Sequence, residues 1–434
     1  MKPENRRAVW SWCMYDWANS AFATTIMAAV LPAYYSLVAA ASLDKTTASS
    51  YWGYTNTIAM CIVAVLAPIL GAMADHGRAR KKYLGVFASL GILFTGLLVL
   101  VSTGDWLMAS VFYIAGRIGF AGGNIFYDAL LPHVAGEERI DQVSAYGYAS
   151  GYLGGGLLLA LNLAAIMKPA VFGIPNTEWA SRLCFVSVAL WWALFALPLF
   201  RNVAEPPTRR IEGESKNPVR ASFQRLRATF GEVKKFREAF KFLIAFWLYN
   251  DGISTIIVMA VIFGAEVGIG QSTLIGAILA VQFVGIPFTV LYGYLAKRLG
   301  TKNSILLGLV VYTVIAIGGY FLRTALHFWI LAFLVGTVQG GTQALSRSLF
   351  GSIIPRLRTA EFFGFYDVSS KFAGILGPLL FGIVGQVTGS SRLSIISLIV
   401  FFIAGGLLLM RVDHDEGMRI ARRSEIGDPG ESAP

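Results

Sequence analysis

Strongly polar side chains recur inside long apolar segments of this chain, at spacings that place them on single helix faces. Asp16 and Asn19 are three residues apart, and Gln339, Gln343 and Arg347 follow one another at steps of four. Residues at these spacings share one face of a helix. An ionisable group within a membrane segment is costly, so it normally faces a partner or a water-filled cavity. We therefore expect these residues to line a polar pathway.

Further apolar segments contribute candidates to the same pathway. These are Arg117, Asn124, Asp128, Asn250, Asp251 and Lys371. A cation at mid-depth must find a carboxylate, a carbonyl group or a ligand. Asp16 and Asp128 also have structural interpretations, as an interhelix hydrogen-bonding residue and as a partner of a loop. A site with both carboxylates and cations suits a small zwitterion or anion better than a lipophilic cation.

The composition indicates that membrane helices position these residues. Hydrophobic residues make up 56% of the chain and charged residues 14%, and the mean hydropathy is +0.62. These values lie outside the usage of soluble proteins. A helix needs about 20 apolar residues to cross a bilayer core of about 30 Å. Twelve segments qualify: Trp10–Tyr35, Tyr51–Met73, Tyr83–Val101, Trp106–Leu131, Val143–Met167, Leu183–Phe200, Ala239–Phe263, Thr273–Leu295, Ile305–Leu322, Phe328–Ile354, Phe362–Val387 and Leu393–Met410.

The basic residues predict the orientation of these spans. With a cytoplasmic N-terminus, 28 of the 36 Lys and Arg residues lie on the cytoplasmic side and three lie within spans. Only five lie outside, namely Lys45, Lys168, Arg182, Arg323 and Arg392. Positively charged loops resist translocation, so this distribution predicts that both termini are cytoplasmic. The expected location is a bacterial inner membrane, where the chain works as a monomer surrounded by lipid.

Two basic, glycine-containing loops divide the chain into similar halves. One follows Gly71 and the other follows Gly293, 222 residues later. Such a repeat is typical of transporters built from two six-helix halves. We expect the loops to be cytoplasmic gates, with Gly71, Asp75, Arg78, Gly293, Arg298 and Gly300 as their key residues.

The expected organisation has four parts. The two six-helix halves are residues 1–200 and 239–411. Residues 201–238 form a cytoplasmic linker whose alternating phenylalanines and basic residues predict an amphipathic helix on the membrane surface. Residues 412–434 are charged and contain Gly and Pro, which predicts a disordered cytoplasmic tail.

Enzymatic functions receive little support from the sequence. The chain has no G-x-x-x-x-G-K-[ST] loop for nucleotide phosphates, and its four histidines fall at span ends or in loops. We therefore expect no enzyme, no cofactor, no metal site and no nucleic-acid partner. A non-transporting membrane sensor or scaffold is the alternative of another class, although such a protein has no need of charges within the membrane.

Several motifs resemble those of known transporters. The paired loops resemble the signature loop of the major facilitator superfamily, and Gly147, Gly151, Gly155 and Gly156 resemble its antiporter motif, with Tyr152 in place of the usual proline. The stretches Tyr15–Ala23, Gln343–Leu349 and Glu361–Tyr366 resemble the autophagy-related vacuolar amino-acid effluxers of fungi and their bacterial relatives.

The resemblance implies an all-α major facilitator fold of twelve spans, in which spans 1, 4, 7 and 10 line a central cavity. It also implies a secondary transporter that moves an amino acid or a similar metabolite by alternating access. Proton-coupled export through Asp16 or Asp251 is one form of this function. A multidrug/proton antiporter is the alternative within transport, and the missing proline argues against it.

Overall fold

The computed structural model describes residues 6–43, 45–77, 79–206, 235–269, 271–372, 376–388 and 390–426, and the structural statements below refer to these residues. Their regular secondary structure is helical. The linker helix predicted within residues 201–238 falls mainly on residues 207–234, which lie outside the described ranges.

The N-terminal half is a bundle of long helices joined by short connections. In chain order it contains α1 (Arg6–Ala21), η1 (Phe22–Ala29), α2 (Val30–Tyr34), η2 (Tyr35–Ala39), α3 (Lys45–Gly77), α4 (Arg80–Leu97), η3 (Leu98–Leu100), α5 (Trp106–Val134), η4 (Glu137–Arg139), α6 (Ile140–Met167), η5 (Pro169–Phe172) and α7 (Thr177–Asn202). The first four elements form one continuous apolar span of 34 residues, in which η1 and η2 have the wider π-helical turn.

The C-terminal half repeats this organisation. It contains α9 (Arg237–Glu266), α10 (Gln271–Leu299), α11 (Thr301–Tyr320), α12 (Ala325–Ser352), η6 (Arg356–Arg358), α13 (Thr359–Phe372), α14 (Leu376–Thr388), α15 (Ser391–Ser397), α16 (Ile399–Met410) and α17 (His414–Ile426). The segment Phe362–Val387, predicted as one span, contains two described helices, α13 and α14. The segment Leu393–Met410 is likewise divided between α15 and α16.

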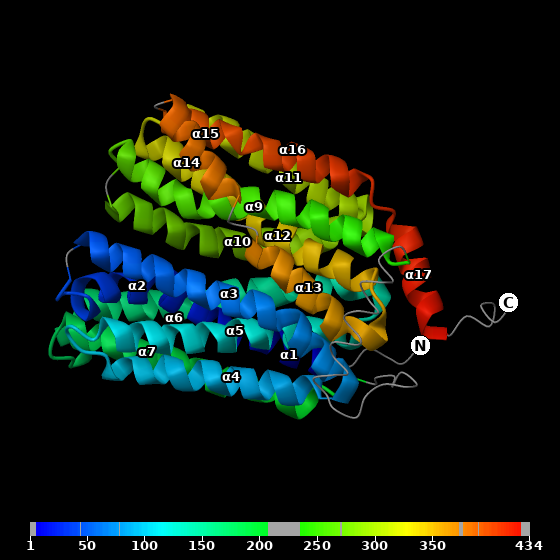
Figure 1. Ribbon diagram of the computed structural model, residues 1–434, viewed down its shortest axis with the longest axis horizontal. Coiled ribbons are helices and arrows are strands. Elements are labelled where there is room, and N and C mark those ends of the chain that lie inside the picture. The colour runs from blue at the N-terminus through cyan, green and yellow to red at the C-terminus, as the bar shows by residue number, and fades with distance from the viewer. Residues whose placement is uncertain are drawn as a thin grey trace.

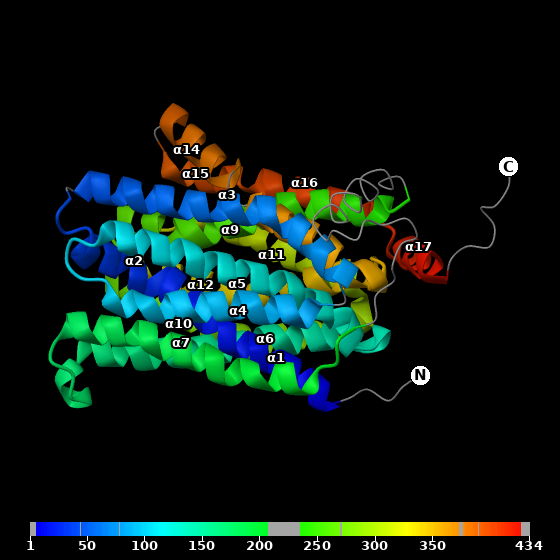
Figure 2. The same ribbon diagram turned by 60° about the horizontal axis from the view of Figure 1, so that its bottom comes forward.

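The two halves lie side by side with their helices along the long axis of the molecule (Figure 1). The blue-to-green N-terminal half and the green-to-red C-terminal half meet mainly where α6 packs on α10 and where α3 packs on α13. The start of α1 and helix α17 lie at the same end of the bundle (Figures 1 and 2). We call this the terminal end, and the opposite one the far end.

Apolar surface and length identify the bundle as a membrane domain. Nine helices or continuous helical segments among the described residues are long and apolar enough to cross a bilayer, and two shorter apolar helices accompany them. Large side chains such as Leu190 and Leu194 on α7 and Val310 on α11 are at least 60% exposed. In water such a surface would be unfavourable, whereas in a membrane it faces the lipid acyl chains.

Small residues allow the helices to approach one another closely. A Cβ atom added at Gly119 of α5 would collide with the backbone of Gly91 on α4. In the C-terminal half, a Cβ atom at Gly405 of α16 would lie 2.8 Å from the backbone nitrogen of Tyr249 on α9. Close backbone contact of this kind is a main source of helix association in membranes.

The predicted disorder of residues 412–434 is wrong for most of this segment. Residues His414–Ile426 form helix α17, which packs against α9 and α12 at the terminal end. Asp413 accepts a hydrogen bond from the backbone N–H of Glu416, a capping contact that fixes the helix start. Ala421 is buried and Met418 packs against the hydrophobic core, so an apolar face holds a helix whose composition is mainly polar.

Candidate functional site

Arg347 is the centre of a buried polar cluster that joins the two halves. It lies on α12, five residues before the end of that helix, and its side chain is 3% exposed. Arg347 was predicted to lie at mid-depth of the span Phe328–Ile354. In the structure it lies within this span but close to the terminal end of α12. Its position in the C-terminal half matters because most of its partners belong to the N-terminal half.

Two carboxylates of the N-terminal half accept hydrogen bonds from Arg347. Its Nη1 atom lies 3.3 Å from Oδ2 of Asp16 on α1 and 3.0 Å from Oδ1 of Asp128 on α5. Nε donates to the hydroxyl of Ser144 on α6 at 2.9 Å, and Nη2 donates to the backbone carbonyl of Ser144 at 2.9 Å. Three helices of one half thus hold a single cation of the other. We call Arg347, Asp16, Asp128 and Ser144 the interdomain latch.

Aromatic rings enclose the interdomain latch. The guanidinium carbon of Arg347 lies 4.4 Å from the ring centre of Tyr148 and 4.9 Å from that of Trp12. Tyr127 stacks on Trp12 with ring centres 4.4 Å apart and donates its hydroxyl proton to Asp16 at 2.9 Å. Rings that face a cation attract it electrostatically and also exclude water, which strengthens the ion pairs.

Sequence reasoning did not single out Trp12, Tyr127, Ser144 or Tyr148. Aromatic and hydroxyl residues are common in membrane helices, so these four carry little signal of their own. Gly147 of the antiporter-like motif is the predicted residue that lies directly beside the ion pair between Asp16 and Arg347. A Cβ atom at this position would lie 2.8 Å from Oδ2 of Asp16 and 3.0 Å from Nη2 of Arg347.

Two other glycines of that motif, Gly151 and Gly155, allow α1 to pack on α6. A Cβ atom at Gly151 would lie 3.4 Å from the carbonyl oxygen of Asp16, and one at Gly155 would lie 3.0 Å from the carbonyl oxygen of Ser20. Gly156 faces α10 instead, where an added Cβ atom would lie 3.6 Å from Cβ of Gln282. Tyr152 stands where the motif usually has proline, and its ring packs on Gly285 of α10, 3.4 Å from the position of an added Cβ atom.

Further contacts join the halves at the terminal end. Asp141, at the start of α6, accepts hydrogen bonds from Thr301 of α11 at 2.6 Å and from Ser348 of α12. Arg80 is fully buried at the start of α4, contacts His133 at 2.8 Å and donates to the carbonyl of Leu357 at 3.2 Å. The terminal end is therefore closed by polar contacts between the halves, and neither Asp141 nor Arg80 was among the predicted residues.

Of the remaining predicted residues of the N-terminal half, Asn19 and Asn124 lie one helical turn from the interdomain latch, and Arg117 lies farther away. The amide of Asn19 on α1 donates to the side-chain oxygen of Asn124 on α5 at 2.6 Å, so the two predicted faces meet. Arg117 lies farther along α5, half-buried, with the Tyr113 hydroxyl 3.5 Å from its Nη1 atom. Among the described residues, no carboxylate lies within ion-pair distance of Arg117.

Asp251 has a different environment from Asp16. It is fully buried on α9, and its carboxylate accepts the backbone N–H groups of Leu376 at 3.1 Å and Gly377 at 2.9 Å. These donors begin α14, where the first backbone N–H groups have no partner within the helix. Asp251 therefore caps a helix of its own half. Its neighbour Asn250 is also buried.

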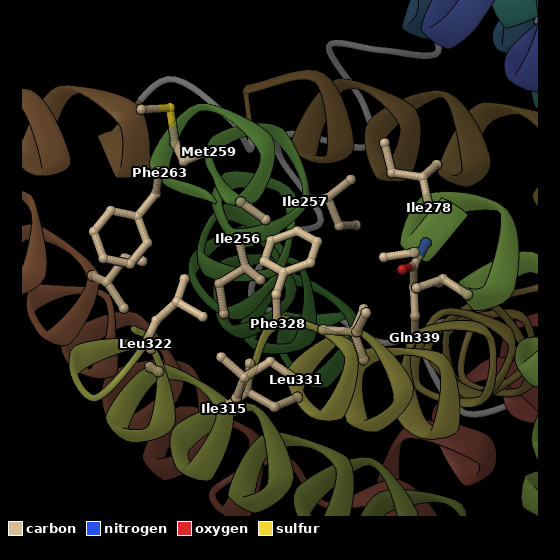
Figure 3. Close-up of a pocket in the computed structure, with 18 of the residues that line it drawn as sticks. Ile256, Ile257, Met259, Phe263, Ile278, Ile315, Leu322, Phe328, Leu331 and Gln339 are labelled. Atoms are coloured by element: carbon tan, nitrogen blue, oxygen red, sulfur yellow. The ribbon is translucent and has the colours of Figure 1, made fainter. Parts of the chain in front are cut away.

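The face of α12 that carries Arg347 leads from the interdomain latch to an apolar cavity. Gln343 is half-buried one turn from Arg347, and Gln339, a turn farther, lines the cavity (Figure 3). The cavity measures about 150 Å³ and lies within the C-terminal half, between residues such as Ile256, Phe263 and Phe328. Lys371 belongs to α13, but its side chain lies outside the described part of the chain.

The structure describes the second predicted gating loop more fully than the first. Gly71 and Asp75 fall in α3, where their side chains are not described, and Arg78 lies outside the described residues. A Cβ atom at Gly293 would lie 2.8 Å from Cβ of Ala145, so this glycine allows α10 to approach α6. Gly300 has a φ of 82°, which favours glycine at the turn into α11. Arg298 is exposed.

A family described as vacuole effluxer Atg22-like matches residues 4–422. The chain belongs to this family. It is 39% identical to the uncharacterized MFS-type transporter YxiO of Bacillus subtilis, over 95% of this chain and 96% of that protein. It is 24% identical to autophagy-related protein 22 of Yarrowia lipolytica, over 86% of this chain and 77% of that protein.

Solved structures agree with the fold of this Atg22-like transporter. The proton:xylose symporter XylE superposes with a TM-score of 0.69, 13% identity and 97% coverage of both chains. The human organic anion transporter MFSD10 gives a TM-score of 0.66, 13% identity and coverage of 94% of this chain and 100% of that chain. The chain is therefore a major facilitator superfamily transporter of the Atg22-like branch, and not an enzyme.

Proposed function

We propose that this Atg22-like chain is a secondary active transporter that exports a small polar metabolite, an amino acid or a comparable zwitterion or anion, by alternating access. The supporting observation is the interdomain latch, in which one arginine of the C-terminal half is held by two carboxylates of the N-terminal half. The description of the family as effluxer-like supports the direction.

The interdomain latch would have to break each time the terminal end opens during alternating access. Its members lie on different halves, so the terminal end can open only if Arg347 separates from Asp16 and Asp128. Separation leaves buried charges without partners, which is unfavourable unless another group compensates them. A zwitterionic or anionic cargo can bind the freed cation. Binding would then favour one state over the other, as coupled transport requires.

A proton is the simplest compensating group for the freed carboxylates. A carboxylate that loses its cation in a low-dielectric environment can bind a proton instead. Asp16 is better suited than Asp251 to couple protons to transport, because its cation lies in the opposite half. Asp251 binds backbone groups of its own half, and these contacts need not change when the halves separate.

We further propose that the chain has twelve spans, with both termini and the terminal end in the cytoplasm of a bacterial cell. The distribution of basic residues carries this proposal. Cysteines introduced in residues 41–50 should react with an impermeant reagent added to intact cells, and cysteines in the linker should not. Labelling of the linker in intact cells would overturn the orientation.

Transport in proteoliposomes tests the proposed function. A thermal-shift screen of purified protein against amino acids and related metabolites identifies a cargo, since a ligand of the native state raises the melting temperature. For that cargo, Asp16→Asn should abolish accumulation driven by a pH gradient and preserve exchange down the cargo's own gradient. Full gradient-driven accumulation in Asp16→Asn would contradict proton coupling through this residue.

A multidrug/proton antiporter remains the second candidate, and the apolar cavity of Figure 3 favours it. The lining of this cavity is almost entirely apolar, which suits a lipophilic molecule better than a zwitterion. Stabilisation by lipophilic cations, with no response to amino acids in the same screen, would select this alternative.

A further inference from the structure

A second concave site lies on the outside of the bundle, along α1 and α6, the helices that also carry Asp16 and Ser144 of the interdomain latch. It is a groove of about 630 Å³ between α1, α6 and α10, open on one side. Arg6 and Arg139 lie at its terminal end, and no acidic residue is among the described residues that line it. Its remaining wall is mainly apolar, with Val9, Met14, Leu153 and Ile286 among its members.

Charge and apolar surface are separated along the length of the groove. Arg6 begins α1 and Arg139 directly precedes α6, so both cations lie where these helices start at the terminal end. From Arg6 to Trp17 the wall follows α1 for eleven residues, or about 16 Å at 1.5 Å per residue. This length is about half of a bilayer core of roughly 30 Å, the depth of a single leaflet.

The rim of the groove has the character of a membrane interface. The indole of Trp10 is 56% exposed, and Tyr146 shares a hydrogen bond of 2.8 Å with Tyr294 across the two halves. Tryptophan and tyrosine gather where acyl chains meet headgroups. Arg139 contacts the side chain of Gln142 at 3.4 Å.

We propose that this groove binds one anionic phospholipid of the leaflet at the terminal end, with its phosphate at Arg6 and Arg139 and an acyl chain along the apolar wall. Basic pockets between membrane helices are suited to acidic headgroups. The chain's own linker is a poorer occupant, because residues 207–234 are rich in Lys and Arg and would repel the two arginines. Since α6 and α10 belong to different halves, the lipid would contact both sides of the interface.

Lipid binding to the purified full-length protein tests this proposal. Native mass spectrometry and thermal unfolding in detergent would compare dioleoyl-phosphatidylglycerol with dioleoyl-phosphatidylcholine. A basic residue near an anionic surface gives about a fivefold gain in binding, so the two arginines should give a preference of roughly thirtyfold for the anionic lipid. Arg6→Gln/Arg139→Gln should abolish most of this preference, and Arg6→Lys/Arg139→Lys should retain it.

Control variants separate the groove from the general basic charge of the protein. Arg201→Gln/Arg411→Gln removes two exposed arginines that do not line the groove, and it should keep the preference. Leu153→Trp fills the apolar wall and should weaken binding of both lipids while both arginines remain. This second variant keeps the proposal testable if Arg6→Gln/Arg139→Gln does not fold.

Three results would overturn the proposal. One is an unchanged preference in Arg6→Gln/Arg139→Gln together with unchanged binding of both lipids in Leu153→Trp. Another is an equal loss in Arg201→Gln/Arg411→Gln, which would show that the total charge decides binding. The third is full stabilisation by glycerol 3-phosphate alone, which would show a site for a soluble anion instead of a lipid.

Discussion

Asp16 and Asp251 of this transporter show how one helical step changes the role of a side chain. Asp16 follows Tyr15 in the first span, and Asn250 occupies the matching place after Tyr249 in the seventh. Asp251 is one residue farther, which turns its side chain by about 100° around the helix axis. Asp16 consequently faces Arg347 of the other half. Asp251 instead faces the start of α14 in its own half.

Under the proposed alternating access, this difference separates a contact that must break from one that need not change. The ion pair of Asp16 crosses the interface between the halves, so it should be lost when the terminal end opens. The hydrogen bonds from Leu376 and Gly377 to Asp251 lie inside one half. Substitutions that affect the two aspartates differently therefore test whether the comparison is correct.

Loss of the shared cation should have the largest effect. Arg347→Ala leaves Asp16 and Asp128, whose side chains are 13% and 19% exposed, without their partner, and breaking such a pair costs up to about 3–5 kcal/mol of stability when it is fully buried. The transport rate should also fall by at least about 100-fold, because a free-energy change of about 3 kcal/mol corresponds to about two factors of ten. Chemical unfolding in detergent and uptake in proteoliposomes measure the two effects.

A matched variant shows whether the unpaired charges cause this loss. Asp16→Asn/Asp128→Asn/Arg347→Gln removes all three charges and should recover most of the stability, but not the transport. Equal instability of the single and triple variants would assign Arg347 a packing role.

The next effect concerns Asp251. Asp251→Ala leaves the N–H groups of Leu376 and Gly377 without this acceptor, and each buried donor left unsatisfied costs about 1–3 kcal/mol. The protein should lose stability, and backbone hydrogen exchange at the start of α14 should increase. Asp251→Asn keeps one acceptor oxygen and should lose less. Normal stability of Asp251→Ala would show that this capping contact is dispensable.

Two glycines allow a finer test of the difference between the aspartates. Gly147 lies beside Asp16, and Gly377 lies beside Asp251. A Cβ atom at Gly147 would lie 2.8 Å from Oδ2 of Asp16, and one at Gly377 would lie 2.8 Å from Oδ1 of Asp251. Gly147→Ala and Gly377→Ala should each cost about 1–3 kcal/mol through overpacking. Of the two, only Gly147→Ala should weaken the closed terminal end.

Gly136→Ala is the control for these glycine substitutions, because an added Cβ atom there meets nothing within 4 Å. Its unfolding midpoint should match that of the unmodified protein. A shift equal to that of Gly147→Ala would attribute the effect to backbone changes instead of contact with Asp16.

The smallest expected effect is the pH response of α17, which lies outside the spans. His414 contacts the Ser352 hydroxyl at 2.8 Å, and burial lowers its pKa below the usual 6.5, against the opposing effect of Asp141 and Asp415. His414 therefore binds a proton more readily when α17 is detached from α9 and α12 than when it is packed against them. The packing of α17 consequently weakens as the pH falls through about 6.5 and below. The protection factors of residues 414–426 in hydrogen exchange, which correct for the intrinsic pH dependence of amide exchange, should be lower at pH 5.5 than at pH 7.5.

His414→Asn provides the control for this pH response, since it keeps a polar side chain that does not titrate. The difference in protection factor between the two pH values should become much smaller in this variant. A difference of the same size would assign the response to groups other than His414.

Much of the polar core could be predicted from sequence because membrane burial makes charges conspicuous. Asp16, Asp128 and Arg347 were identified by their presence in apolar segments. Their pairing could not be predicted, since Asp16 and Arg347 are 331 residues apart and helical spacing describes only neighbours on one helix. The contacts of Asp141 and Arg80 that close the terminal end could not be predicted either, because they depend on how the two halves pack against each other.

Other features escaped prediction for different physical reasons. Ser144 contributes mainly through its position, and its residue type is common in membrane helices. The disorder predicted for the tail was based on composition, which ignores the spacing of Met418 and Ala421 on one face of α17. The different role of Asp251 depends on the direction of its side chain toward α14, a helix more than 100 residues away.

A distance measurement across the terminal end tests the central claim most directly and needs no knowledge of the cargo. Cys13, Cys61 and Cys184 would be replaced, and spin labels placed at Arg201 and Arg411, which are exposed on the N-terminal and C-terminal halves. Pulsed electron paramagnetic resonance should show longer distances in Asp16→Asn/Asp128→Asn than in the parent, and no change in Asp251→Asn. Unchanged distances in Asp16→Asn/Asp128→Asn, or an equal lengthening in Asp251→Asn, would contradict the proposed role of the interdomain latch.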